Sequence, residues 1–445
     1  MSVDWKITSL REAGVTLIDC DHRTPPAASS GFPYIAIPQL KEGRIVLNDV
    51  RRISPEHLAE WTRKAKPQHN DVILSRRCNP GETAYVPAGL ECALGQNLVL
   101  LRADGTKLFP PFLRWLVRGT EWWEQVGTFI NVGAVFDSLK CADIPNFSMR
   151  LPPLPEQKAI AAVLGALDDK IELNRWMNAT LEAMVRALFQ SWFVDFDPVR
   201  AKLDPAGRDQ LPNLDPATAE LFPDSFQDSP IGPVPTGWKV ERFDAHITAD
   251  RGLSYKGEGL RDDRTGLPMH NLNSIFEGGG YKHAGIKYYQ GEYREKHLVD
   301  PGDMIVTNTE QGFDHLLIGY AAIVPRCFGS KGLFSHHIYR VRFKPTSPFN
   351  PHYLVELFNN RRWHYWISGF SNGTTINMLP IDALEMPLLV VPPKELVKQF
   401  TAIAQAAHDQ IEDNIQQSHT LASLRDTLLP KLLSGELSTE RFQSP

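Results

Sequence analysis

An internal repeat constrains this chain more than any other feature of its sequence. With an offset of 240 residues, a stretch of about 80 residues aligns with a later stretch without gaps. The identities include Phe109 with Phe349, Trp123 with Trp363, Gly133 with Gly373, Leu139 with Leu379, Asn174 with Asn414 and Leu188 with Leu428. Upstream the offset decreases to 232–235, which a few loop insertions explain. Because chance rarely keeps one register over such a length, the sequence predicts two copies of one structural unit.

Each copy has the same order of segments. A block of about 150 residues contains short β-like runs, such as DVILS and QNLVLL or DMIVTNT, separated by Gly, Pro, Asn and Asp. A proline-rich stop, LPPLP or VPP, then precedes about 35 residues with helical periodicity. This order predicts an α/β (α+β) protein with two mixed α/β blocks and two long helices.

The segment boundaries follow from these patterns. They are 1–150 for the first block, 151–194 for the first long helix, 195–236 for a proline-rich acidic linker, 237–390 for the second block, 391–436 for the second long helix and 437–445 for a tail. Because eight prolines fall between residues 195 and 235, we expect the linker to be extended, with little core of its own.

Both long helices carry a heptad seam, with residues spaced alternately by three and four. In the first helix the expected seam is Ile160, Val163, Leu167, Lys170, Asn174, Met177, Leu181, Met184 and Leu188, and the second helix repeats these positions at an offset of 240. Two amphipathic helices lying on separate blocks would show the same pattern. We favour the interpretation in which the two helices pack on each other as an antiparallel coiled coil.

A polar amide lies at the centre of each seam. Antiparallel pairing of two helices of equal length would bring Asn174 and Asn414 together, because both lie near the helix midpoints. A buried amide pair stabilises less than two leucines, but it penalises slipped registers. The residues predicted to set the coiled-coil register are Asn174, Asn414, Ile171, Ile411, Leu181 and Leu421.

The bulk composition narrows the class of protein. The formal net charge of −5 does not distinguish DNA from protein partners, since the acidic surplus is concentrated between residues 151 and 235. The five cysteines form no CxxC pair, which argues against a disulfide framework and a zinc site. No run approaches the ~20 consecutive apolar residues of a membrane helix, and the N-terminus lacks a signal-peptide pattern. We expect a cytoplasmic protein without a membrane partner.

Motifs of catalysis are missing or weak. The sequence has no GxxxxGK[ST] loop for nucleotide phosphates, and CNPGE at 78–82 lacks the aromatic residue of an amino-methyltransferase tetrapeptide. The charged run GEYREK at 291–296 is predicted to be a solvated surface rather than a nuclease site. His336 and His337 have no acid or cysteine ligands near them in sequence. We predict no catalytic residue and no metal site in this chain.

Four segments resemble the DNA-specificity subunits of type I restriction–modification systems. They are LPPLPEQKAIAAVLGALDDKIELN at 151–174, LFQSWFVDFDPVRAK at 188–202, LFPDSFQDSPIGPVPTGW at 221–238 and LRDTLLPKLLSGEL at 424–437. The two blocks match this family only in architecture. The resemblance implies two target recognition domains, each reading one half of a bipartite site in double-stranded DNA, with the two long helices between them.

The resemblance also implies partners and a division of chemistry. A specificity subunit would dock two modification (adenine N6-methyltransferase) subunits, and restriction (translocase and nuclease) subunits would join that core. No cofactor is expected on this chain, because S-adenosylmethionine, ATP and Mg²⁺ are implied for the partner subunits. Two alternatives stay open: a two-headed scaffold whose blocks bind proteins, and a nuclease that cuts DNA as the purified chain.

The candidate DNA-contacting residues are polar or basic side chains in predicted loops beside strands. Arg can bind guanine, and Asn or Gln can bind adenine, through two hydrogen bonds, whereas Lys mostly positions phosphates. The candidates are Lys64, Lys66, Gln68, Asn70, Arg76, Arg77 and Asn131 in the first block, and Lys256, Arg264, Asn308, Gln311, Lys331, Asn372, Thr374 and Thr375 in the second. Asn131 and Asn372 are favoured because both lie in glycine-containing loops before the connection to a long helix.

Overall fold

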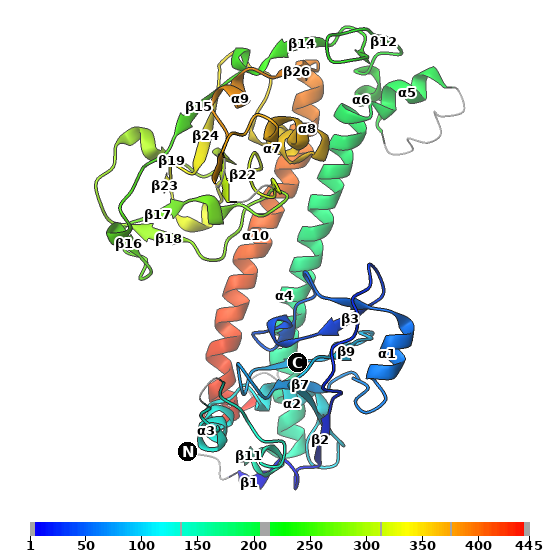
Figure 1. The fold of residues 1–445 in the computed structure, drawn as a ribbon, viewed down its shortest axis with the longest axis vertical. Coiled ribbons are helices and arrows are strands. Elements are labelled where there is room, and N and C mark those ends of the chain that lie inside the picture. The colour runs from blue at the N-terminus through cyan, green and yellow to red at the C-terminus, as the bar shows by residue number, and fades with distance from the viewer. Residues whose placement is uncertain (1–4, 134–135, 205–213, 312–313, 374–375, 440–445) are drawn as a thin grey trace. The chain divides into compact units, whose positions relative to one another are not determined.

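The computed structural model describes residues 5–133, 136–204, 214–311, 314–373 and 376–439 (Figure 1). It confirms a duplicated protein of mixed α and β structure with two long helices. The chain forms two compact units, unit 1 (Met1–Leu173 with Ser418–Pro445) and unit 2 (Asn174–Gln417). The unit boundaries therefore fall inside the long helices, whereas the sequence pattern placed segment boundaries at the helix ends.

Unit 1 is built on a four-stranded antiparallel sheet in the order β2-β10-β7-β8. Its strands are β2 (Val15–Asp19), β7 (Val72–Ser75), β8 (Thr83–Tyr85) and β10 (Leu98–Ala103). All four residues of β7 are buried, because side chains from both faces of the sheet enter hydrophobic clusters. Burial on both faces explains why the strand appears in the sequence as a continuous apolar run rather than an alternating one.

Helices and short strands complete unit 1. The helices are α1 (Pro55–Trp61), α2 (Pro110–Leu116), α3 (Thr120–Phe129) and the first part of α4 (Leu154–Phe189). The remaining strands are β1 (Lys6–Ser9), β3 (Phe32–Ile35), β4 (Leu40–Lys41), β5 (Arg44–Ile45), β6 (Arg52–Ile53), β9 (Ala93–Leu94) and β11 (Ser148–Leu151). One core combines sheet residues with Phe112 and Trp115 of α2, Trp122 of α3 and Ile160 of α4. The same core receives Leu429 from the end of α10 (Lys394–Leu433).

Unit 2 repeats the central sheet in the order β15-β24-β20-β22. Its strands are β15 (Ile247–Arg251), β20 (Met304–Thr307), β22 (Ala321–Ile323) and β24 (Ile338–Phe343). The helices of the second block are α7 (Pro351–Asn359), α8 (Arg361–Ser368) and α9 (Asp382–Glu385). The unit also has a five-stranded sheet, β16-β18-β17-β23-β19, formed by β16 (Leu260–Arg261), β17 (Leu267–His270), β18 (Lys287–Tyr289), β19 (Leu298–Val299) and β23 (Gly332–Phe334).

The strand registers show that the repeat is structural. Lys6 pairs with Leu151 where β1 closes the first block against β11, and Lys239 pairs with Val391 where β14 (Lys239–Arg242) meets β26 (Leu388–Val391). Likewise β3 runs parallel to β9, and β17 runs parallel to β23. In both copies, an antiparallel strand pair therefore closes the block just before the long helix begins.

The two long helices pack on each other in each unit (Figure 1). In unit 1 the Arg425 guanidinium of α10 lies 2.6 Å from the Asp168 carboxylate of α4. In unit 2 Asn174 of α4 contacts Asn414 of α10, and Phe189, further along α4, contacts Phe400, which lies earlier on α10. The helices are therefore antiparallel, as predicted. No helix in the described ranges is long and apolar enough to cross a membrane.

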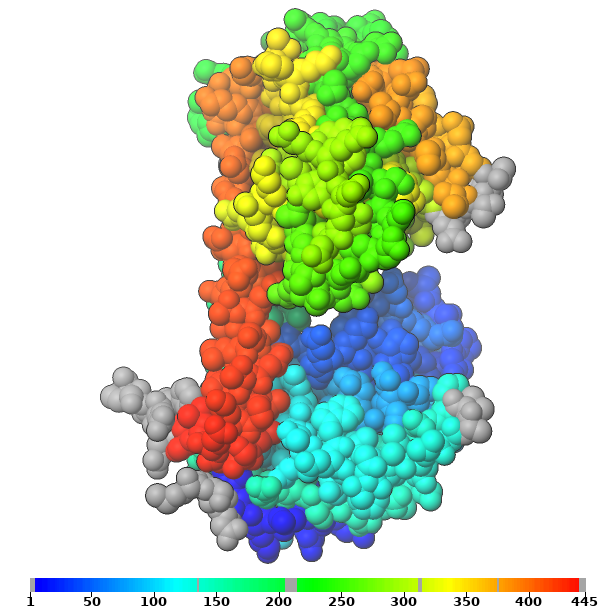
Figure 2. Space-filling model, turned by 90° about the vertical axis from the view of Figure 1, so that its left-hand side faces the viewer, coloured from blue at the N-terminus to red at the C-terminus, as the bar shows by residue number. Residues whose placement is uncertain are grey.

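The seam lies one residue away from its predicted positions over much of its length. The exposed members of the predicted seam include Met184, Ile403 and Leu424, whereas the next residues, Val185, Ala404 and Arg425, are buried. In Figure 2 one side of α10, coloured orange to red, forms part of the molecular surface. The spacing of apolar residues did not predict the buried positions, because two charged residues, Asp168 and Arg425, lie in the buried seam. Of the register residues, Asn174, Asn414 and Ile171 are buried, and Ile411, Leu181 and Leu421 are half-buried.

The segment between the two blocks differs from the expected extended linker. A π-helical turn (Gln190–Val194) continues α4, and α5 (Asp197–Leu203), α6 (Pro216–Glu220), β12 (Phe226–Gln227) and β13 (Val234–Pro235) follow. Phe196 and Phe222 are buried against Trp238, with ring centroids 5.7 and 6.2 Å apart. These aromatic side chains place the described part of the segment in the core of unit 2. The proline content of the segment gave no indication of this burial.

Candidate nucleic-acid interface

Three loop segments of unit 1 meet beside the end of β7. Ser138 lies between Arg77 and Asn131 and forms an antiparallel bridge with each of them. Asn131 and Ser138 exchange both backbone hydrogen bonds, at 2.8 and 3.0 Å, and the Leu139 N–H donates to the Arg76 carbonyl at 2.9 Å. We name this arrangement the loop ribbon of unit 1, formed by residues 76–77, 131 and 138–139.

Unit 2 contains the same loop ribbon. Asn372 and Met378 exchange both backbone hydrogen bonds, at 3.0 and 2.9 Å, and the Leu379 N–H donates to the Asn308 carbonyl at 2.8 Å. Here the pairing is longer, because β21 (Thr309–Gln311) pairs with β25 (Ile376–Met378). The loop ribbon of unit 2 thus comprises residues 308–311, 372 and 376–379. Six candidates predicted from sequence lie in the two loop ribbons: Arg76, Arg77, Asn131, Asn308, Gln311 and Asn372.

Each loop ribbon presents one face to solvent. Phe136 and Ile376 are equivalent positions, and the side chain of each is 58% exposed. Met378, two residues beyond Ile376, is 44% exposed, whereas Leu379 and its equivalent Leu139 are buried. Alternate residues of an extended segment point to the same side, so positions 376 and 378 share the outer face.

A glycine in each loop ribbon allows the chain to approach its own backbone closely. A Cβ added at Gly133 would lie 2.3 Å from the Phe136 carbonyl oxygen. At the equivalent Gly373, which has a φ of +156°, a Cβ would lie 2.1 Å from the Ile376 carbonyl oxygen. Both contacts are with backbone atoms, which a side-chain rotation cannot relieve. A side chain at either position would therefore collide with the backbone, which explains why both positions are glycine.

The inner side of the unit 2 ribbon is held by a buried carboxylate. Glu310 lies in β21, and its two carboxylate oxygens accept backbone N–H bonds from Leu316, Leu317 and Ile318 at 2.7, 3.0 and 2.9 Å. The side chain is buried. Sequence reasoning missed Glu310, because its partners lie in a loop that unit 1 lacks at the corresponding point.

The structure places Asn308 in a different role from the expected one. Its side chain is 2% exposed; its Nδ2 donates to the His336 carbonyl at 3.1 Å, and its Oδ1 accepts from the Thr309 hydroxyl at 2.6 Å. Because both ends of the amide are bonded, this placement argues against a base contact. Asn131 is half-buried, and its Nδ2 lies 3.3 Å from the Phe129 carbonyl, whereas Asn372 is exposed.

The other candidates lie apart from the loop ribbons or outside the described structure. Lys64, Lys66, Gln68 and Asn70 precede β7, whereas Arg76 and Arg77 follow it, so a strand of four residues separates the two groups. Lys256, Arg264 and Lys331 are exposed in unit 2. The side chain of Gln311 and the whole of Thr374 and Thr375 lie outside the described residues.

Ion pairs fix each block to a long helix, and sequence reasoning did not identify them. In unit 1 Asp168 of α4 lies within 3.1 Å of Arg44, Arg114 and Arg425. Although burial opposes ionisation, these guanidinium groups hold the pKa of Asp168 below its ordinary value. In unit 2 Arg326 pairs with Glu412 of α10. Although burial opposes this as well, hydrogen bonds from His408 and Arg326 lower the pKa of Glu412 to about 2.

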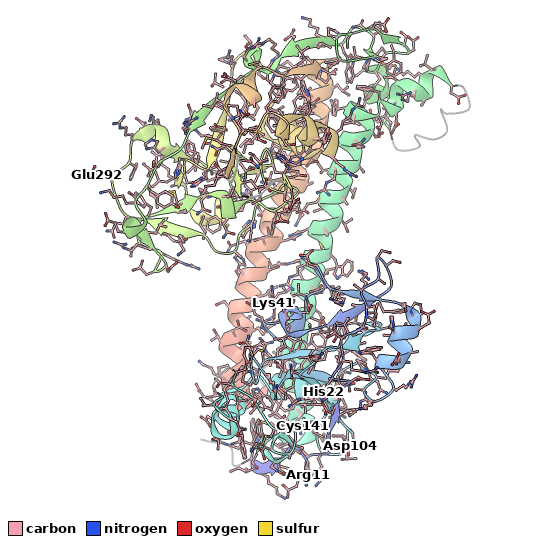
Figure 3. The ribbon with its side chains drawn as sticks, viewed as in Figure 1. Arg11, His22, Lys41, Asp104, Cys141 and Glu292 are labelled. Carbon is pink, nitrogen blue, oxygen red and sulfur yellow. The ribbon has the colours of Figure 1, made fainter. Side chains whose placement is uncertain are left out.

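One group of potential metal-ligand atoms occurs in unit 1, where the sequence predicted no site. The ligand atoms of Asp19, Cys20 and His22 lie within 4.8 Å of one another (His22 is labelled in Figure 3). The Cys20 thiol, however, is buried and donates to the Gly95 carbonyl at 3.2 Å. Burial raises the pKa of Cys20 to about 11, which disfavours the thiolate that a metal requires. The Cys20 thiol therefore acts as a buried hydrogen-bond donor within the protein.

The fold and the site define a duplicated binding protein with one equivalent exposed ribbon in each unit. Comparisons with known proteins give the family. Residues 19–183 match the family model described as a type I restriction modification DNA specificity domain. The type I restriction enzyme MjaIX specificity subunit of Methanocaldococcus jannaschii is 24% identical over 403 residues, covering 88% of this chain and 83% of the relative.

Two further comparisons cover almost the whole chain. The putative type I restriction enzyme MjaX specificity subunit of the same organism is 30% identical over 448 residues, covering 98% of this chain and 94% of the relative. In fold, the chain is similar to the crystal structure of the type I system S subunit from M. genitalium, with a TM-score of 0.54, 13% identity and 96% coverage of both chains. This chain belongs to the family of type I restriction enzyme specificity subunits. Such a subunit recognises DNA and is not the catalytic chain of the enzyme.

Proposed function

We propose that this specificity subunit reads a bipartite site in double-stranded DNA, with one loop ribbon directed at each half-site. The observation that carries the proposal is the pair of equivalent ribbons, built from the same backbone hydrogen bonds around Ser138 and Met378. A β-ribbon fits the major groove of B-DNA, where the edges of all four base pairs can be distinguished. Exposed lysines outside the ribbons, among them Lys64, Lys256 and Lys331, would position the phosphates.

The proposed partners are two modification subunits and the restriction subunits of the same system. The modification subunits would bind S-adenosylmethionine and methylate adenine, and the restriction subunits would use ATP and Mg²⁺. A complex of this kind would act on DNA in the cytoplasm. The duplication supports two modification subunits, because two equivalent units offer two equivalent docking surfaces.

The first experiment tests the division of labour. The purified chain is mixed with its modification subunit and S-adenosylmethionine, and the methylated adenines of plasmid DNA are mapped by sequencing. We expect methylation of one bipartite motif only when both proteins are present. Methylation or cleavage by the specificity chain alone would contradict the proposal. Exchanging residues 1–150 for the corresponding block of a relative should change one half-site, and a change in both half-sites would contradict the assignment of one unit to each.

The second experiment tests the long helices as the spacer. Deleting seven residues from α4 and the facing seven residues from α10 shortens the helix pair by ~10 Å, since each residue contributes ~1.5 Å. At ~3.4 Å per base pair, the gap between the half-sites should shorten by about three base pairs. Both half-site sequences should persist. A motif with an unchanged gap would exclude the helices as the element that sets the spacing.

A further inference from the structure

We propose that the two loop ribbons read chemically different base pairs: Arg77 reads a guanine in the half-site of unit 1, and Ile376 with Met378 reads thymine methyl groups in the half-site of unit 2. The inference rests on the proposed function and assigns the bases that each unit would recognise. It follows from the side chains that the two units place at equivalent positions of their loop ribbons.

The two ribbons share the backbone hydrogen bonds around Ser138 and Met378, although the pairing is longer in unit 2, so we look for differences in recognition among their side chains. Ser138 and Met378 each exchange two hydrogen bonds with an asparagine, and the residue after each donates to the chain that follows the central strand. At three positions of the ribbons the copies differ: Arg77 corresponds to Thr309, Phe136 to Ile376 and Ser138 to Met378. Two half-sites of different sequence require different side chains at equivalent positions of the two ribbons.

In unit 1 the reading group is a guanidinium. Arg77 is exposed, and its neighbour Arg76 is half-buried with Nη1 3.5 Å from the Leu139 carbonyl. Arg76 is thus directed at the protein backbone, which leaves Arg77 as the arginine of the pair that faces solvent. A guanidinium can donate two parallel hydrogen bonds to O6 and N7 of guanine in the major groove.

In unit 2 the position of Arg77 cannot read DNA in the same way. The Thr309 side chain is 5% exposed; its hydroxyl donates to Asn308 Oδ1 and lies 3.2 Å from His337 Nδ1. The outer face is formed instead by the apolar side chains of Ile376 and Met378. In the major groove only thymine presents a methyl group, so an apolar face selects A·T pairs. The exposed Asn372, which bridges to Met378, is placed to bond adenine beside them.

The test of Arg77 uses the complex of the full chain with its modification subunit. Competition binding measures affinity for the mapped site and for variants with each base pair of the first half-site changed in turn. We expect Arg77→Ala to lower the preference for one G·C pair by roughly 5- to 150-fold and to leave the second half-site unchanged. Arg77→Lys should keep overall affinity and still relax that preference. Retention of full G·C preference by both variants would overturn the guanine assignment.

The test of the apolar face uses deoxyuridine, which differs from thymidine by the missing methyl group. Replacing single thymines of the second half-site with deoxyuridine should weaken binding of the unmodified complex several-fold at one or two positions. The Ile376→Ala, Met378→Ala double variant should bind the two DNAs equally. A wild-type complex indifferent to every such replacement would overturn the thymine assignment, as would a variant that remains as sensitive as wild type.

The outcome also separates this inference from the proposed function. Specific binding to a bipartite site with unaltered base preferences in these variants would overturn only the assignment of bases. Failure of the unmodified complex to bind any specific DNA would overturn the proposed function, and with it this inference. Thermal unfolding of each variant shows whether a lost preference arises from a damaged fold.

Discussion

The Asn174 side-chain amide donates to the backbone carbonyl of Asn414 at 3.2 Å, and also to Gln417 Oε1 at 2.9 Å. Asn414 in turn donates to Asn178 Oδ1 at 2.8 Å, and its own Oδ1 accepts from Gln410 Nε2 at 3.0 Å. Asn174 is 0% exposed and Asn414 4% exposed. Five amides therefore form a polar layer between α4 and α10 in unit 2.

Replacing both central asparagines with leucine should preserve stability and weaken the choice of register. The double variant removes two buried polar groups but leaves three amides without their partners, so we expect the free energy of unfolding to change by less than about 2 kcal/mol. Asn174→Leu alone should destabilise the fold no more than the double variant, because the Asn414 side chain keeps its bonds to Asn178 and Gln410 and only Gln417 loses its side-chain donor. Urea unfolding measures stability, and methylation mapping measures the register as a broader range of tolerated gap lengths. A double variant with the wild-type gap would contradict a register role.

The contact between the two asparagines could be predicted because it depends only on the repeat and on antiparallel symmetry. The exact seam could not. Asp168 and Arg425 occupy interior positions, and burial of a charge becomes favourable only through partners such as Arg44 and Arg114, which come from elsewhere in the chain. A helical pattern contains no information about those partners, so it assigned exposed Met184 and Leu424 to the interior.

The candidate site also combines features that could be predicted from the sequence with features that could not. The loops that form the ribbons were found because glycine, asparagine and arginine in a predicted loop are local signals. What each side chain does there depends on tertiary contacts. Asn308 and Arg77 looked alike in the sequence as polar residues after a strand, yet one is buried with its amide bonded and the other is exposed. The role of Glu310 could not be predicted from the sequence, because the fold alone brings together the backbone N–H groups that donate hydrogen bonds to its carboxylate.

Acid should selectively weaken the anchor at Asp168. Since the pKa of this carboxyl is lower in the folded state, its ionisation stabilises the fold above the ordinary value of 3.8, and this contribution is lost as the pH falls below that value. At pH 7 we expect Asp168→Asn to lower the free energy of unfolding by ~3–5 kcal/mol, because it removes the buried counter-charge that the three arginines share. Arg44 and Arg425 then keep only the more exposed carboxylates of Glu172 and Asp426. The difference from wild type should shrink near pH 3. Urea unfolding at both pH values checks this, with exposed Asp169→Asn as the matched control.

Removal of Arg326 should raise the pKa of Glu412. The Arg326 guanidinium and its backbone N–H both bond to the Glu412 carboxylate, and together with His408 they lower its pKa to about 2. In Arg326→Met we expect the pKa to rise from about 2, since the guanidinium is lost and burial favours the neutral acid, while His408 and the backbone N–H of residue 326 still lower it. A ¹³C titration of the glutamate carboxyls measures the shift, with Glu412→Gln to assign the signal. Arg361→Met, a change of an exposed arginine of α8, should leave the pKa of Glu412 at its wild-type value.

Adding one methyl group to the turn of a loop ribbon should disable one half-site. In Gly133→Ala the new Cβ would meet the Phe136 carbonyl oxygen at 2.3 Å, so the backbone there must shift and the hydrogen bonds between Asn131 and Ser138 weaken. Gly127→Ala is the matched control, because a Cβ there, within α3, meets nothing within 4 Å. We expect Gly133→Ala to lower the free energy of unfolding by about 1–2 kcal/mol. The control should be neutral or up to about 1 kcal/mol more stable, since alanine favours a helix over glycine.

The decisive readout is DNA recognition by the complex with the modification subunit. In competition binding, Gly133→Ala should lose discrimination in the first half-site at least ten-fold more than Gly127→Ala, while the second half-site is still read. Gly373→Ala should do the reverse, because its Cβ would lie 2.1 Å from the Ile376 carbonyl oxygen at the equivalent turn. This crossed pattern requires two ribbons that act independently on two half-sites. Equal loss of both half-sites in either variant, or behaviour of Gly133→Ala like that of its control, would show that the turns do not shape the DNA-reading surface.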